Sequence, residues 1–252
     1  MDDKWLNILQ KLMAKAEDSA TTMDERNAIV EKMTFLMAKH GIEQAMLNAE
    51  QDKPEAVISV RFTLNNPYLN PKITLLYGIV KTFGAHGIMA EMSQRKPGRY
   101  RGLQPAPDAK TVMQIYGYSS DIEKILMLNG SLNIQMSTAL AGAIKPVHMH
   151  GKTFNSSFVV GYVDTVVVRV ASAYTKAKTD VSSSATGNGM ELVLKTRTAA
   201  IMDAFKLDHP HVHRINTTSR ATSATAYGAG QFAGRNANIG QTGLGGGRKA
   251  IE

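Results

Sequence analysis

The feature that most constrains this chain is a pair of helical apolar stripes within its first 42 residues. Apolar side chains recur at spacings of three and four from Trp5 to Ala16, and again from Ala28 to Met37. This period places them on one face of each helix, while lysine, asparagine and glutamine fill the other face of the first. The stretch from Lys4 to Ile42 is therefore predicted to be a helical hairpin that docks on a core.

Capping signals set the expected limits of the second helix. Thr22, with Glu25 three residues later, fits a capping box, in which the hydroxyl and the carboxylate each bind a free backbone amide. The sequence His40-Gly41-Ile42 predicts the end of the helix, because glycine readily adopts the left-handed conformation found there. One more short helix is expected from Glu43 to Gln51.

The next part of the chain alternates between strand and helix patterns. Apolar and polar residues alternate over 56–64, which predicts a half-buried strand. A helix is expected at 71–83, and short strands follow at 88–92 and 111–116, separated by a polar, basic loop at 93–110. These elements predict a small three-stranded β-α-β-β sheet with helices on one side.

Long helical patterns dominate the second half of the chain. Ser120 and Glu123 fit a capping box at the start of a helix that runs to about residue 140. A second long helix is expected over 154–178, where the helical period outweighs the low helix propensity of a run of valines. The first of these two helices is apolar over more than one face and should be central to the fold.

The C-terminal third is predicted in less detail. Residues 190–205 suggest a strand followed by a helix from Arg197, and 221–236 suggest a helix of small residues. The Gly-rich stretch 240–247 cannot hold regular structure. The predicted fold class is α+β, in three parts: an N-terminal helical domain (1–53), an α+β core (54–206), and a C-terminal helix with a flexible basic tail (207–252).

Composition narrows the classes of protein that remain. The chain has 252 residues and no cysteine, which excludes disulfides, thiol nucleophiles and cysteine-ligated metal centres. No run of about 18 apolar residues is present, and the acidic, amphipathic N-terminus is unlike a signal peptide. We therefore expect a cytoplasmic protein with no membrane partner.

Charge is unevenly distributed along the chain. The net charge is +8, yet residues 1–55 carry seven Lys/Arg against eleven Asp/Glu. The basic remainder suits a polyanion or an acidic protein surface, with a solvated surface as the open alternative. Basic and aromatic side chains together can hold phosphates and stack on bases. The candidate nucleic-acid or acidic-partner residues are Arg95, Lys96, Arg99, Tyr100, Arg101, Arg235, Arg248 and Lys249.

Two loops carry histidines at alternate positions. Alternate residues of an extended segment face the same side, and imidazole is a common metal ligand. No HExxH motif, acidic metal motif or cysteine accompanies them, so ordinary loop histidines are the favoured interpretation. The weak metal candidates are His148, His150, His209, His211 and His213.

No motif for catalysis or for a cofactor is recognisable. Gly228-x-Gly230-x-x-x-Gly234 lacks the P-loop sequence and a strand–turn–helix context, and close packing of a small-residue helix is the favoured interpretation. No serine lies in a GxSxG elbow, and no pair of carboxylates lies in a motif that would set acid and base roles. We expect no enzymatic activity and no cofactor.

Several short motifs, in order along the chain, resemble those of one protein family. They are Leu-x-Ala-Lys-Ala-Glu at 12–17, Leu-Met-Ala-Lys-His-Gly-Ile at 36–42, Asn66-Pro67-Tyr68 before Leu75-Leu76-Tyr77, the helix start at 117–123, Asn155-Ser156-Ser157-Phe158 leading to Gly161-Tyr162, and the Gly/Arg segment 227–239. In these motifs the chain resembles uncharacterised proteins common in actinobacteria and their phages, whose N-terminal helical-hairpin domain has no assigned function.

One branch that the chain resembles comprises early proteins of Streptomyces-type phages that act as recombination directionality factors. This resemblance implies binding to the coiled-coil region of the phage's large serine integrase. It implies a switch from integration to excision, the recombination of attL with attR, in the host cytoplasm. Contact with DNA within the integrase complex stays open. The alternatives are a DNA-binding phage early regulatory protein and, less favoured, a metal-dependent hydrolase.

Overall fold

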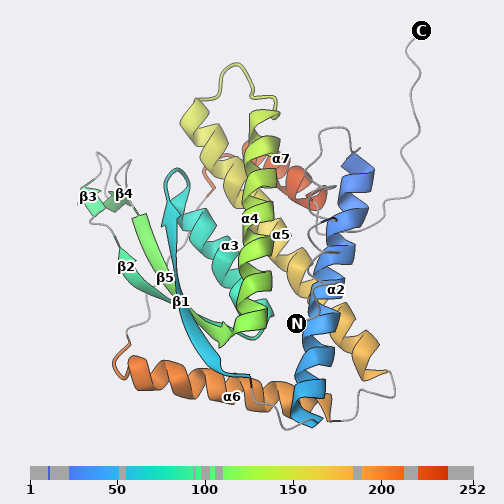
Figure 1. The fold of residues 1–252 in the computed structure, drawn as a ribbon. Helices are drawn as coiled ribbons and strands as arrows, with labels where there is room; N and C mark the ends of the chain where they lie inside the picture. The colour runs from blue at the N-terminus through green and yellow to red at the C-terminus, as the bar shows by residue number, and fades with distance from the viewer. Residues whose placement is uncertain are drawn as a thin grey trace.

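The computed structural model describes residue 11 and residues 23–50, 55–92, 95–97, 103–105, 110–183, 189–212 and 221–237. Over this part of the chain it forms six helices and five strands (Figure 1). In order they are α2 (Met23–Glu50), β1 (Val57–Asn65), α3 (Leu69–Thr82), β2 (His86–Met92), β3 (Arg95–Pro97), β4 (Leu103–Pro105), β5 (Lys110–Tyr118), α4 (Ser119–Ala141), α5 (Gly151–Ser182), α6 (Met190–Asp208) and α7 (Ala224–Arg235).

β1, β5 and β2 form an antiparallel sheet with β5 in the centre. Alternate residues of a strand point to the same face, so Phe62 opposite Met113 and Val60 opposite Ile115 face the core together. α3 and α4 pack behind this face (Figure 1). A small three-stranded sheet packed against long helices confirms the predicted α+β class.

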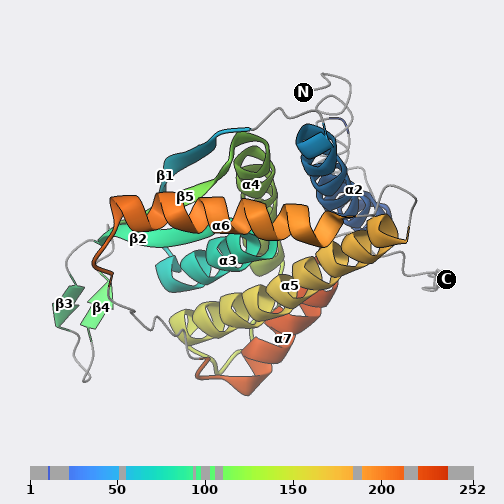
Figure 2. The ribbon, with the colours of Figure 1, turned by 90° about the horizontal axis from the view of Figure 1, so that it is seen from below.

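α5 is the central helix of the molecule (Figure 2). Its side chains Phe158, Tyr162 and Val170 are almost wholly buried, and it contacts α2, α3, α4 and α7. Because it is buried on several sides, packing outweighs the modest helix propensity of its valines. By length and composition α5 could cross a membrane, but 56% of its most apolar window is buried inside the fold.

α2 runs without a break from Met23 to Glu50, so the predicted helix end at Gly41 and the separate helix from Glu43 are wrong. Gly41 serves a close approach instead, because a Cβ there would lie 3.0 Å from Lys124 Nζ on α4. A glycine that admits a neighbour has the same sequence signature as a glycine that ends a helix. The first helix of the predicted hairpin, apart from a helical Lys11, and the Thr22 cap of the second helix lie outside the described residues.

The segment 93–110, predicted to be a loop, contains a short β-ribbon. β3 pairs with β4 in antiparallel register, with Arg95 opposite Pro105 and Pro97 opposite Leu103. A two-stranded ribbon consists entirely of edges, and proline is tolerated at strand edges. The proline and glycine content that suggested a loop therefore did not exclude these strands.

α6 is helical throughout, so the strand predicted at the start of 190–205 is wrong. Leu194, Ile201 and Phe205 fall on one helical stripe, which the apolar run before Arg197 obscured. Ile201 and Phe205 pack against Tyr116 on the sheet face opposite the core. Figure 2 shows α6 crossing this face at one end, so the prediction that helices cover one side alone is also wrong.

The other predicted helices are confirmed, with small differences at their ends. α3 begins at Leu69 rather than at residue 71, α5 extends from Gly151 to Ser182, and α7 lies within the predicted 221–236. The predicted boundaries after residues 53 and 206 stay predictions. Met37 of α2 and Ala226 of α7 belong to the same core cluster as the buried face of α5.

Candidate functional site

The predicted basic residues fall in separate parts of the molecule. Arg95 and Lys96 lie on β3, whereas Arg235 is exposed at the end of α7, away from the ribbon (Figure 1). The remaining candidates lie outside the described residues: Arg99, Tyr100, Arg101, Arg248 and Lys249. Arg95 and Lys96 therefore share an element with each other but not with Arg235.

The candidate histidines occupy two sites with different roles. His148 and His150 are exposed in the loop between α4 and α5, and His150 Nδ1 accepts a hydrogen bond from the Lys152 amide at 3.3 Å, which caps α5. His209 packs against Phe205 at a ring-centroid distance of 5.5 Å, His211 is exposed, and His213 lies outside the described residues. Over the described residues, no three or more His, Asp or Glu side chains form a group that could hold a metal ion.

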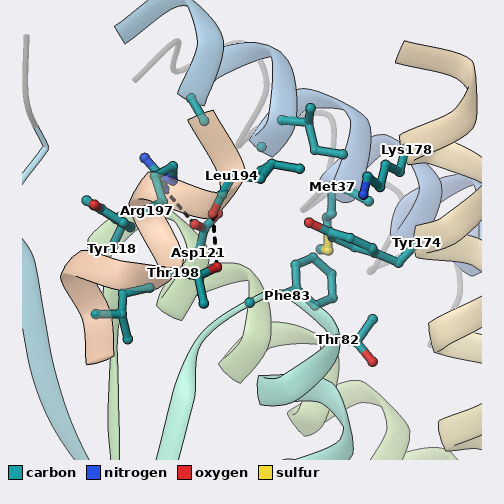
Figure 3. A pocket seen from close by; sticks show the side chains of 16 residues that line it. Met37, Thr82, Phe83, Tyr118, Asp121, Tyr174, Lys178, Leu194, Arg197 and Thr198 are labelled. Atoms are coloured by element: carbon teal, nitrogen blue, oxygen red, sulfur yellow. Dashed lines mark hydrogen bonds and ion pairs between the residues drawn. The ribbon is translucent and has the colours of Figure 1, made fainter. Parts of the chain in front are cut away.

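A pocket of about 150 Å³ lies where α2, α5 and α6 meet the start of α4 (Figure 3). Its apolar wall includes Met37, Phe83 and Leu194, and Asp121 and Arg197 form its polar side. Neither the acid nor the arginine was among the residues predicted to form a site. The segments that line the pocket come from both halves of the chain.

Arg197 is the centre of a largely buried ion-pair network beside this pocket. Its Nη2 lies 2.7 Å from Asp121 Oδ2 and its Nη1 lies 3.6 Å from Glu55 Oε2, with side-chain exposures of 15% to 18% for all three. The guanidinium carbon also lies 3.5 Å from the centroid of the Tyr118 ring, a favourable cation–π geometry. Lys124 Nζ adds a longer contact of 3.4 Å to Asp121. Two cations and two carboxylates thus join α6 to α4 and to Glu55, two residues before β1.

Glu55 also caps α4, which corrects the predicted capping box of Ser120 and Glu123. The N-cap residue is Tyr118, without a side-chain cap, and the Ser120 amide donates instead to Glu55 Oε1 at 3.0 Å. The hydroxyls of Ser119 and Ser120 donate to the same carboxylate. Burial alone would raise the pKa of Glu55, but these hydrogen bonds and the Arg197 charge outweigh it and lower the pKa.

Tyr174 supplies a neutral donor that points into the pocket (Figure 3). Burial, with a smaller contribution from the nearby Asp121 charge, raises the pKa of Tyr174 to about 12, so its hydroxyl stays protonated at neutral pH. Arg197 already binds both Asp121 and Glu55. These three residues are therefore engaged in ion pairs and do not form a catalytic acid–base pair. We call the ion pairs among Glu55, Asp121, Lys124 and Arg197 the ionic joint, and a small cavity lies beside it.

A second polar cluster joins the end of α6 to the sheet. The Tyr116 hydroxyl donates to Asp208 Oδ2 at 2.8 Å and accepts from Gln114 Nε2 at 2.7 Å. Burial first, and Asp208 second, raise the pKa of Tyr116 to about 12. The His86 ring lies 4.1 Å from Phe205, centroid to centroid, and burial lowers the pKa of His86. His209 Nε2 is buried without a hydrogen-bond partner among the described residues.

The loop between α4 and α5, residues 142–150, presents an unusual surface, and we name it the α4–α5 tip. Ile144 and Val147 are 93% and 92% exposed, the highest values among the large apolar side chains in the described part of the chain. Apart from the weak metal candidates His148 and His150, the sequence prediction gave this loop no role. The sequence signal for this surface was the pair of apolar residues, Ile144 and Val147, in a loop that contains no acidic residue.

The ionic joint was missed for a different reason. In the sequence Asp121 is a favourable charge at the predicted helix start, and Arg197 marks only the start of a predicted helix. Glu55 was placed just after a domain boundary and given no role. The signal that could have found them is the position of Arg197 on the apolar stripe of α6, where an arginine needs a buried partner.

Comparison with known proteins gives one match. A family described as protein of unknown function (DUF2786) matches residues 5–44, which is about a sixth of the chain. No curated protein matches, and no solved structure matches. The matched segment includes the described part of α2 up to Gln44, and the family has no assigned activity.

Proposed function

We propose that this chain is a recombination directionality factor, a phage protein that binds a large serine integrase and switches it from integration to excision. It acts through protein–protein contact in the host cytoplasm, without catalysis or a cofactor. The proposal carries over the role of the phage proteins that the chain resembles. The DUF2786 match lies on the N-terminal segment where that resemblance begins.

The observation that carries the proposal is where the resembling motifs lie in the fold. Gly161 approaches Tyr227 so closely that a Cβ would overlap its carbonyl oxygen, and Gly230 approaches Phe158 in the same way. Ser157 Oγ accepts the Thr222 and Ser223 amides at 3.0 and 3.1 Å. The start of α4 carries Asp121 of the ionic joint. These motifs are packing joints and therefore belong to the scaffold, and the proposal places the function on the surface that this scaffold presents.

The mechanism is a population shift in the integrase. A factor that binds one geometry of the integrase coiled-coil arm better than another moves the equilibrium by the ratio of the two affinities. Each tenfold difference is worth about 1.4 kcal/mol. A rigid binding protein is sufficient for this role, because no bond of the substrate DNA is broken by the factor itself.

The test is co-purification and recombination with the large serine integrase encoded in the same genome. We expect the chain to co-purify with the intact integrase, and not with an integrase that lacks its coiled-coil region. We also expect it to stimulate attL × attR recombination and to inhibit attP × attB recombination. If the intact integrase neither retains the chain nor changes its recombination products, the proposal is wrong.

Direct DNA binding is the second candidate, and the β3–β4 ribbon favours it. A two-stranded ribbon can enter the major groove, and Arg95 and Lys96 lie on this one. Binding through phosphates should weaken steeply as salt rises. Reversing the charges of Arg95, Lys96, Arg99 and Arg101 should then reduce duplex affinity measured by fluorescence anisotropy, and unchanged affinity would remove this candidate.

A further inference from the structure

The α4–α5 tip is the outermost part of the end where α4 and α5 meet (Figure 1). We propose that it docks into the groove of a two-helix coiled coil whose flanking positions are acidic, with Ile144 and Val147 as its anchors. The proposal rests on the proposed function, in which the coiled coil belongs to the integrase, and it adds which surface of this chain makes the contact and what chemistry the partner presents.

Local contacts hold the tip in one shape. The Met149 amide donates to the Pro146 carbonyl oxygen at 3.0 Å, which closes a turn. The Ser223 hydroxyl donates to Met149 Sδ at 3.5 Å and ties this turn to the residue before α7. The His150 cap then fixes the start of α5. A loop already fixed in this way loses little conformational entropy on binding, which suits an anchor.

The tip displays its apolar side chains where nothing in the described chain covers them. Ile144 and Val147 lie three residues apart on either side of Lys145-Pro146, and each is more than nine-tenths exposed. Single exposed apolar side chains are common on protein surfaces. Two on one protruding, fixed turn are suited to filling a partner's pocket, and such central anchors supply most of the affinity of an interface.

The charge around these anchors has one sign. Between Lys124 and Asp164 the sequence contains no acidic residue, and its two lysines are Lys145 and Lys152, both exposed. His148 and His150 add donors on the same loop. A partner that surrounds the anchors must therefore offer acidic groups at the edges of an apolar depression.

A two-helix coiled coil with acidic flanks fits this requirement. Its a and d side chains pack into each other between the two helices, so only their edges line a shallow groove, and the charged e and g positions border this groove. An anionic membrane surface would also attract lysines next to aliphatic side chains. However, residues 142–152 contain no tryptophan or tyrosine, the aromatic residues that are enriched at membrane interfaces. We therefore assign the tip to a protein partner.

The first experiment compares two doubly substituted chains in binding to the integrase. Ile144→Asp with Val147→Asp should weaken binding, measured by biolayer interferometry, by more than about thirtyfold, the scale of an interface hot spot. Val168→Asp with Leu192→Asp is the matched control, because it places the same charges at exposed apolar sites on α5 and α6. We expect the control to change binding less than threefold. Equal effects of both pairs would overturn the assignment, provided that circular dichroism shows both folded.

The second experiment does not need the integrase. Two synthetic coiled coils with identical seams, one with glutamate and one with lysine at the flanking positions, are titrated into chain labelled at isoleucine and valine methyl groups. The acidic coiled coil should shift the methyl signals of Ile144 and Val147, less strongly at high salt, and the basic one should not. Shifts with both or with neither, or shifts only with vesicles of phosphatidylcholine and phosphatidylserine, overturn the proposal.

Together the two experiments separate this inference from the proposed function. If the acidic coiled coil shifts the tip signals while the integrase fails to bind, the tip stands and the directionality-factor function fails. If the integrase binds the Ile144→Asp, Val147→Asp chain as tightly as the unmodified chain, the function stands and the tip fails. If neither the acidic coiled coil nor the integrase binds the chain, both the tip proposal and the directionality-factor function are wrong.

Discussion

α7 and α6 are held on the molecule in two different ways. α7 lies on α5 with backbone against backbone, because Gly161 and Gly230 leave no side chain between the helices. Arg169 supplements this contact through hydrogen bonds to the carbonyls of Gly234 and Ala237. α6 instead lies across the sheet and α4 through the Arg197 network and the Tyr116–Asp208 hydrogen bond.

This difference determines whether the contact of α5 with α7 (the α5–α7 joint) or the contact of α6 with α4 and the sheet (the α6 joint) responds to pH and salt. Close backbone packing depends on shape, and shape does not change with pH or with salt. Buried ion pairs depend on protonation, and removing one partner leaves the other buried without compensation. We therefore expect the α5–α7 joint to be sensitive to added atoms and the α6 joint to be sensitive to charge.

Adding one methyl group to the α5–α7 joint should have the largest effect. Gly230→Ala places a Cβ against the Phe158 carbonyl, which belongs to the backbone and cannot rotate away. We expect a loss of about 4 kcal/mol or more in the free energy of unfolding, above the usual range for overpacking. Urea denaturation measures the loss, and hydrogen exchange of α7 amides locates it.

The same helix supplies the matched control. A Cβ at Gly228 meets nothing within 4 Å, so Gly228→Ala should stabilise α7 by about 0.5–1 kcal/mol through helix propensity alone. If Gly228→Ala destabilises the chain as much as Gly230→Ala, the joint is not defined by close approach.

Removing the cation of the α6 joint should have the next largest effect. Arg197→Met keeps the apolar stem but leaves Asp121 and Glu55 without their guanidinium, at a cost of about 3 kcal/mol in stability. Lys195→Met, at an exposed position on the same helix, should cost less than about 0.5 kcal/mol. Asp121→Asn also removes the carboxylate beside Lys124, so the test is a double-mutant cycle: Arg197→Met and Asp121→Asn together should cost less than the sum of the two single losses, and additive losses would argue against the ion pair.

The α6 joint should also show the pH dependence that the α5–α7 joint lacks. The pKa of Glu55 is lowered in the fold, so its contribution is fully present above the unfolded-state pKa and is lost as pH falls through the folded-state pKa. Glu55→Gln should therefore be less stable than the unmodified chain at pH 7, and the two curves should converge in acid. Thermal unfolding between pH 7 and pH 3 measures this, with Glu123→Gln as the exposed control on α4. Parallel curves would contradict the assigned role of Glu55.

The smallest effect is expected at the other end of α6. Tyr116→Phe removes the hydroxyl that donates to Asp208 and should cost about 1 kcal/mol, the usual net value of one hydrogen bond. Tyr77→Phe alters a half-exposed phenol on α3 and should be neutral. Denaturation midpoints of the two variants give the comparison, and equal midpoints would mean that the hydrogen bond contributes nothing.

Hydrophobic periodicity predicted those helices and strands whose buried face follows the local pattern of apolar residues. The strand 56–64 and the helices around α4, α5 and α7 were found because one buried face recurs along each of them. The close helix packing predicted for the glycines of α7 is confirmed at Gly230 and Gly234, whereas Gly228 has open space around it. In each case the decisive information lies within about four residues along the chain.

Features that depend on distant partners were not predictable in this way. Gly41 looks like a helix end until Lys124 is seen beside it. The cap of α4 comes from Glu55, about sixty residues earlier, and not from the local capping box. Arg197 breaks an apolar stripe unless Asp121 is placed opposite. The site was missed because its meaning lies in pairs that only tertiary structure brings together.

The continuity of α2 has a consequence for how the chain can be divided. The family match stops at residue 44, but α2 continues to Glu50 and its buried face includes Ile42 and Met46. A fragment cut at the end of the similarity would sever a helix in the middle of its contact surface. The segment that matches the family and the segment that can be excised intact are therefore different, and any truncation used to isolate the N-terminal segment should retain the whole of α2.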